Sequence, residues 1–98
     1  MNISKTLEGT ELTIALAGRL DTATAPELEK EIKDSLGGIT KFTLDLAKLE
    51  YISSAGLRVL LGAQKVMNKQ GEMIVTNVSS DIQEIFDVTG FCDILNIQ

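Results

Sequence analysis

Two adjacent serines, Ser53 and Ser54, carry the clearest chemical signal in the sequence. They are followed at once by Ala55 and Gly56, where a strand-like segment gives way to a helical one. The first turn of a helix presents unpaired N–H groups and a partial positive charge, so a serine there either caps the backbone or holds a phosphate. Because serine is a preferred N-cap residue, the pair by itself favours the capping role.

A basic stripe follows on the same predicted helix. Arg58, Lys65 and Lys69 recur at helical spacing, with Gly62 between them. We expect the stripe to be exposed, either as a solvated face or as a docking surface for an acidic partner. A glycine inside a helix costs about 1 kcal/mol relative to alanine, and the close approach of a partner backbone or of the preceding helix would each explain Gly62. The opposite, apolar face of this helix is expected to comprise Val59, Leu60, Ala63, Val66 and Met67.

The residue types that are missing restrict the chemistry. The chain has no histidine, which removes Ser-His-Asp and Cys-His catalysis and imidazole metal sites. Its single cysteine, Cys92, has no second cysteine with which to form a disulfide or a zinc site. We therefore predict a protein that is not an enzyme and that holds no metal and no cofactor. The rival hypothesis, an enzyme with Ser54 as nucleophile activated by Asp21 or a lysine, has no visible supporting motif.

Composition and charge restrict the partners and the location. With 98 residues the chain suits one domain, and 44% apolar residues are enough for a core. The net charge of −5 argues against nucleic acid as a partner, because binding to phosphate backbones requires clustered Lys and Arg. No apolar run approaches the ~18 residues of a membrane span, and no signal-peptide pattern is present. We expect a cytoplasmic protein without membrane insertion.

Hydrophobic periodicity predicts the elements of the first half. Residues 2–7 and 11–17 alternate like the two strands of a β-hairpin. Thr24 is a candidate N-cap, and Pro26 suits the first turn of a helix that should run to about Leu36. This helix has the amphipathic pattern of one that lies on a sheet.

The second half continues the alternation of strands and helices. Residues 41–46 predict a strand, the helix that follows the serines should reach about Gln70, and Gly71 is its expected C′ residue. Residues 72–78 predict a further strand, and residues 91–97 predict either a last strand or a packed extension. Between them, a short helix is expected to carry a capping box formed by Ser80 and Gln83 and to end at Gly90.

This order of elements predicts an α/β fold: one domain over residues 1–98, with a mixed, mostly parallel sheet of 4–5 strands and helices packed on it. Residues 51–61, with the sequence YISSAGLRVLL, resemble the phosphorylation loop of STAS domains, above all the anti-sigma factor antagonists. Residues 16–21, LAGRLD, resemble the family's Gly-x-Leu-Asp turn, and residues 71–73 and 85–90 resemble its later segments. The resemblance spans nearly the whole chain.

The resemblance implies a switch in which the unphosphorylated domain binds an anti-sigma factor and so releases the sigma factor. The anti-sigma factor is itself a serine kinase that phosphorylates the domain and breaks the complex, and a phosphatase would reset it. The matching acceptor is Ser54, with Ser53 as the alternative. Ser53 stands where many relatives carry aspartate, and Ala55 stands where a hydroxyl residue is common.

Asp21 lies near the phosphorylation loop according to the same resemblance, and its other role is that of a turn cap. The residues expected to contact the partner are Asp21, Ser53, Ser54, Ala55, Gly56, Arg58, Gly62 and Lys65. The alternative function is a STAS subunit of another regulatory or lipid-transport assembly, acting as a passive protein-binding module without phosphorylation.

Overall fold

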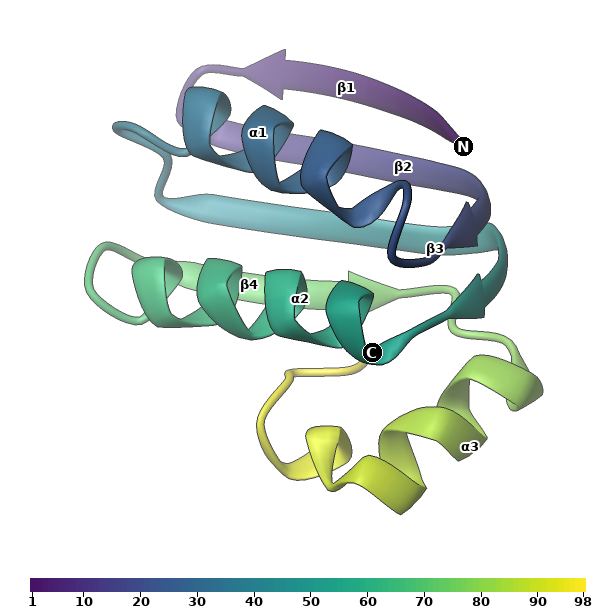
Figure 1. Ribbon diagram of the computed structural model, residues 1–98. Coiled ribbons are helices and arrows are strands. Elements are labelled where there is room, and N and C mark those ends of the chain that lie inside the picture. Colours follow the sequence, from purple (N-terminus) through teal and green to yellow (C-terminus); the bar gives the residue numbers. More distant parts are fainter.

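The computed structural model describes all 98 residues of the chain. Its elements are β1 (Asn2–Glu8), β2 (Glu11–Leu20), α1 (Ala25–Ser35), β3 (Lys41–Ile52), α2 (Ser54–Met67), β4 (Glu72–Thr76), α3 (Ser80–Thr89) and a 3-10 turn, η1 (Phe91–Asp93). The four strands form one sheet in the order β1-β2-β3-β4 (Figure 1). The β1–β2 hairpin is antiparallel and the other two pairs are parallel. The predicted α/β fold with a mixed, mostly parallel sheet is confirmed.

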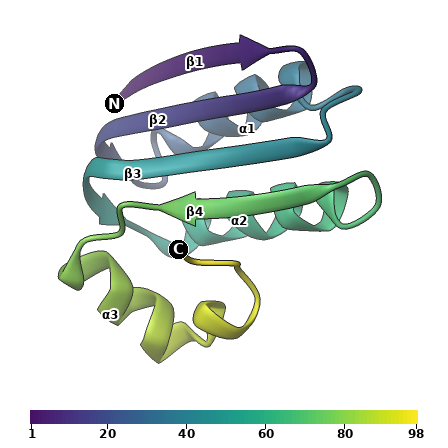
Figure 2. The ribbon, with the colours of Figure 1, turned by 180° about the vertical axis from the view of Figure 1, so that it is seen from behind.

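The helices are distributed unequally over the sheet. α1 and α2 lie side by side on one face, and α3 lies beyond β4, while the opposite face carries no helix (Figure 2). Leu12, Ile14 and Leu16 of β2 alternate toward the covered face and are buried there in a core of 24 residues. Strand alternation therefore buries one apolar row and leaves the other row, of smaller side chains, on the open face. None of the helices combines the length and the apolar character that crossing a bilayer requires.

The third strand is twice as long as its periodicity predicted, because residues 41–46 are only its first half. Its second half pairs with the end of β2, where Arg19 lies opposite Tyr51 and Leu20 lies opposite Ile52. The pairing register shifts twice along this stretch, which breaks the alternation of buried and exposed residues. The consequence is that β2 and β3 together extend to the point where α2 begins.

The end of α2 also differs from the prediction. The helix ends at Met67, with Asn68 as its C-cap, rather than near Gln70. Gly71 does not adopt the left-handed C′ conformation; instead its backbone lies against Thr40, and a Cβ on Gly71 would be in severe collision with the Thr40 carbonyl group. Gly71 is therefore required for a close approach between two loops and not for ending the helix.

The loops at this end of the sheet are joined by hydrogen bonds. The Thr40 N–H donates to the Thr10 carbonyl at 2.9 Å, and the Glu72 N–H donates to the Thr40 carbonyl at 3.0 Å. The Gln70 side chain donates to the Leu36 carbonyl at 2.6 Å. The starts of the three parallel strands are thus tied together, at the end of the sheet opposite to the start of α2.

The third helix has a different cap from the one predicted. Ser79, and not Ser80, is the N-cap: its hydroxyl accepts from the Ile82 N–H at 3.3 Å. Ser79 has the extended backbone that an N-cap needs, whereas Ser80 is already helical. Gly90 ends the helix in the left-handed conformation, as predicted.

The tail is a packed extension rather than a further strand. It touches the sheet through a single parallel bridge between Ile97 and Val75, and Leu95 is buried in the core. The sheet therefore has four strands, at the lower end of the predicted number.

Candidate functional site

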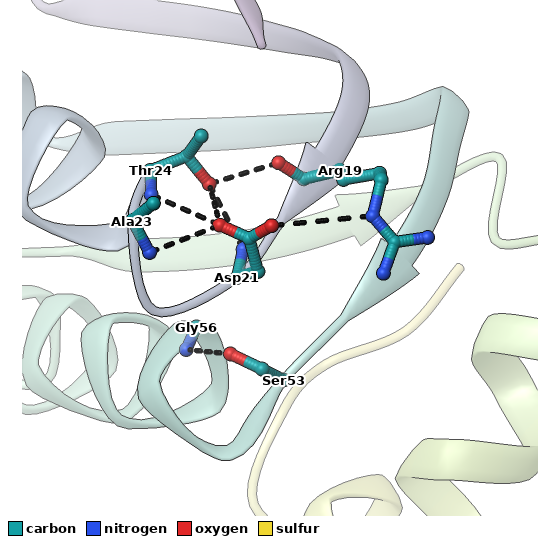
Figure 3. Close-up of polar contacts among 6 residues, drawn as sticks. All are labelled: Arg19, Asp21, Ala23, Thr24, Ser53 and Gly56. Carbon is teal, nitrogen blue, oxygen red and sulfur yellow. Dashed lines mark hydrogen bonds and ion pairs between the residues drawn. The ribbon is translucent and has the colours of Figure 1, made fainter.

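Ser53 connects the end of β3 to the start of α2. Its N–H donates to the Leu20 carbonyl at 2.8 Å, which fastens the turn to the end of β2. Its hydroxyl accepts from the Gly56 N–H at 3.3 Å, so Ser53 is the N-cap of α2 (Figure 3). The capping role that the Ser-Ser pair favoured is confirmed for this serine.

Ser54 is the first residue of α2 and is exposed. Its hydroxyl has no hydrogen-bond partner in the chain, and neither have the N–H groups of Ser54 and Ala55. The first turn of α2 contains no acidic residue, and Arg58 follows one turn later. Free N–H groups at the positive end of a helix favour an anion, so this position can accept a phosphate without unfavourable charges from its own helix.

Asp21 organises the turn between β2 and α1. Its Oδ1 accepts from the N–H groups of Ala23 at 3.0 Å and of Thr24 at 3.1 Å (Figure 3). These bonds, above all that from Thr24, hold the pKa of the Asp21 carboxyl below its ordinary value. Thr24 is the N-cap residue of α1, as predicted, but its side chain makes no cap hydrogen bond to the helix.

Arg19 and Tyr51 form a pair that the sequence did not single out. The Arg19 guanidinium carbon lies 4.4 Å from the centroid of the Tyr51 ring, and its Nε lies 3.9 Å from Asp21 Oδ2. Both side chains are exposed, and their strand positions lie within two residues of Ser53 and of its backbone partner Leu20. Arg19 and Tyr51 are neighbours because they lie opposite each other on β2 and β3. The sequence did not indicate this pair because the predicted strand ended at residue 46, before Tyr51.

Gly56 was expected to contact a partner, but the structure buries it. A Cβ on Gly56 would lie 2.7 Å from Leu20 Cγ and 2.9 Å from Ile52 Cγ1. The missing side chain lets the first turn of α2 pack on the ends of β2 and β3. Gly56 therefore positions Ser54 and offers no side chain to a partner.

The basic stripe of α2 lies on the surface, as expected. Arg58, Lys65 and Lys69 are exposed, and no acidic group lies within 4.0 Å of any of them. Gly62 is exposed too, and a Cβ there would meet no atom within 4 Å, so packing against α1 does not explain this glycine. Val66, expected on the buried face, is 43% exposed.

Comparison with known proteins agrees with this architecture. The family model of the STAS domain matches residues 2–98. BtrV of Bordetella bronchiseptica is 38% identical over 88 residues, which cover 88% of this chain and 76% of that protein. The anti-sigma-B factor antagonist of Listeria monocytogenes is 33% identical over 104 residues, which cover 100% of this chain and 90% of that protein.

Solved structures share the fold at low sequence identity. The anti-sigma factor antagonist SpoIIAA in its unphosphorylated form aligns with a TM-score of 0.77 and 18% identity over 99% of this chain and 87% of its own. An anti-sigma factor antagonist from Mycobacterium paratuberculosis aligns with a TM-score of 0.88 and 20% identity over 98% and 83%. The match of the family model to nearly every residue and the identity to the relatives lead to one conclusion: the chain belongs to the STAS domain family.

Proposed function

We propose that this protein is an anti-sigma factor antagonist whose binding to an anti-sigma factor is controlled by phosphorylation of Ser54. The Listeria relative, which matches the whole chain, carries the first part of this function in its name. The anti-sigma factor would act as the serine kinase and supply the ATP, and a phosphatase would reverse the modification. In this role the protein binds and does not catalyse, and it works in the cytoplasm with the sigma factor.

One observation carries the choice of residue: Ser54 is exposed with a free hydroxyl, whereas the hydroxyl of Ser53 is engaged in the cap of α2. A kinase must reach an oxygen that is free to attack the terminal phosphate of ATP. Phosphorylating Ser53 would remove a cap, while phosphorylating Ser54 would add charge at a helix N-terminus that favours it. Both considerations support Ser54.

The proposed switch acts on the interface and not on the fold. A phosphate on Ser54 would add about −1.5 to −2 charges at pH 7 and three acceptor oxygens. In the free protein the helix N-terminus and water accommodate this charge. In a complex the same charge would have to be desolvated against the partner, so association would fail while the scaffold stays unchanged.

The contact surface that we propose begins at the end of the sheet where β2 and β3 stop and continues along α2. It comprises Asp21, Ser53, Ser54, Ala55, Arg58, Gly62 and Lys65 from the sequence-based expectation, together with Arg19 and Tyr51. Asp21 contributes through its second oxygen, which lies 3.9 Å from Arg19 Nε, while the first holds the turn.

The test is a parallel pull-down from the source cytoplasm with wild type, Ser54→Ala and Ser54→Asp, with the retained proteins identified by mass spectrometry. We expect wild type and Ser54→Ala to retain one common kinase-like partner and Ser54→Asp to lose it. Adding ATP should release the partner from wild type, with a phosphate mapped to Ser54, but not from Ser54→Ala.

A partner that is retained equally by all three proteins, with or without ATP, would contradict the switch. That result would instead favour the passive STAS module of another assembly. Phosphate found on Ser53 would keep the switch but move the acceptor.

A further inference from the structure

A groove of about 450 Å³ separates α1 from α2 on the helical face of the molecule. Its apolar lining comes from both helices and comprises Ile32, Leu36, Val59, Ala63 and Val66. Val66 leaves 43% of its surface exposed in this groove and is not among the buried residues of α2. Val66 is therefore the exposed apolar side chain of the groove, while Ile32, Leu36, Val59 and Ala63 are buried at its floor.

Gly62 lies in the wall of this groove. A Cβ at this position would meet no atom within 4 Å, so the fold itself gains nothing from the glycine. Alanine is a better helix former than glycine, so alanine there would stabilise the helix. No contact within the chain requires residue 62 to lack a side chain. The glycine is explained if another molecule occupies the space beside it.

The charges on the two rims of the groove differ. On the α1 rim, Lys33 and Glu29 form an ion pair at 3.0 Å and neutralise each other. On the α2 rim, Arg58 has no acidic partner, and neither has Lys65 further along the helix. α2 contains no acidic residue at all, on a chain of net charge −5. This helix therefore offers uncompensated positive charge next to an apolar floor.

On α2 the groove begins at Arg58, one turn after the proposed phosphorylation site. Ser54, Arg58 and Gly62 stand four residues apart and so share one side of α2. We propose that an acidic amphipathic segment of the partner protein occupies the groove, with apolar side chains against its floor and carboxylates against Arg58 and Lys65. This inference rests on the proposed function, because a partner that covers Ser54 reaches the groove one turn further along the helix.

A second copy of the chain is a poorer occupant. A two-fold contact through α2 would bring the same surface of both copies together. Arg58 and Lys65 would then face like charges across the interface, which is unfavourable. An acidic segment meets the same surface with complementary charge.

The test uses two synthetic peptides of about 14 residues, the common length of a short helix. Both carry leucine at the same amphipathic positions, and the remaining positions are glutamate in one peptide and lysine in the other. Each is titrated into the ¹⁵N-labelled protein while the backbone amide signals are recorded. We expect the acidic peptide alone to shift the signals of the groove residues. Gly62→Leu and Arg58→Glu should each weaken its binding by about tenfold or more, equivalent to 1.4 kcal/mol.

Lys48→Glu is the matched control, because it reverses the charge of an exposed cation on β3 outside the groove and should leave the affinity unchanged. No shifts, or equal shifts with both peptides, would overturn the inference. Groove signals that move with protein concentration alone would assign the groove to a second copy. Ser54→Ala cannot be phosphorylated but should bind the acidic peptide like wild type, so a failure of the switch and a failure of the groove remain distinguishable.

Discussion

Gly56 and Gly62 lie six residues apart on α2, and the same substitution should have opposite effects at the two positions. Gly56 faces the core, where an added Cβ would lie 2.7 Å from Leu20 Cγ and 2.9 Å from Ile52 Cγ1. Gly62 faces the groove, where an added Cβ meets nothing within 4 Å. Both changes convert a helical glycine into alanine, so each is the control for the other.

The magnitudes follow from these two environments. Alanine in place of a helical glycine contributes about 1 kcal/mol to the free energy of unfolding. For Gly62→Ala nothing opposes this gain, so we expect Tm to rise by roughly 5 °C. For Gly56→Ala, the added Cβ would lie below 3.0 Å from two buried side chains, those of Leu20 and Ile52. We therefore expect overpacking to lower the free energy of unfolding by about 3 kcal/mol, the upper end of the usual range. The net result is a loss of about 2 kcal/mol, or roughly 10 °C in Tm.

Urea denaturation followed by far-ultraviolet circular dichroism measures both values on the two variants and the wild type. The m-value should not change, because neither substitution alters the surface exposed on unfolding. A Gly56→Ala variant as stable as Gly62→Ala would refute the packing of α2 on Leu20. A Gly62→Ala variant less stable than wild type would refute the open space in the groove.

Three further predictions concern single side chains. Ser53→Ala should lower the free energy of unfolding by about 1 kcal/mol because the cap of α2 is lost, while Ser54→Ala should change it by less than about 0.5 kcal/mol. Equal effects of the two substitutions in urea denaturation would contradict the separate roles of the two serines. The ionised Asp21 carboxyl stabilises the fold at pH values above its ordinary pKa, and this contribution is lost as the pH falls through the lowered pKa of the folded state. The Tm of Asp21→Asn should therefore fall less steeply than that of wild type as the pH is lowered. Gln64 is buried with its Oε1 unpaired, while its Nε2 donates to Asn68 Oδ1 at 2.8 Å. Because an unpaired buried oxygen costs more than one hydrogen bond contributes, Gln64→Met should raise the free energy of unfolding by about 1 kcal/mol in the same assay, and a loss would show that the bond to Asn68 outweighs the unpaired oxygen.

Most of the fold was predictable because the signals that specify it are local. The alternation of Leu12, Ile14 and Leu16 and the helical spacing of Leu28 and Ile32 are properties of short segments, and the structure buries all five side chains. The second half of β3 was not predictable in this way. Its pairing with β2 passes through two register shifts, and these depend on the partner strand rather than on the segment's own pattern.

The site was predictable in its position but not in its division of roles. Ser-Ser-Ala-Gly before an apolar helical run indicates a helix start whatever surrounds it. Whether Ser53 or Ser54 caps the helix depends on backbone torsions at a single residue. Likewise Gly56 and Gly62 are alike in the sequence, and only the position of Leu20 on a neighbouring strand makes one indispensable and the other replaceable.

The hydrogen bonds through Thr40 at the starts of the parallel strands have a consequence for how such proteins diversify. They hold the relative register of β2, β3 and β4 from the end that lies away from Ser54. Exposed side chains around Ser54 can therefore change without loosening the strands, whereas the buried Gly56 cannot, because its space is filled by Leu20 and Ile52. Chains of this fold can therefore present different exposed side chains beside α2 on the same alignment of strands.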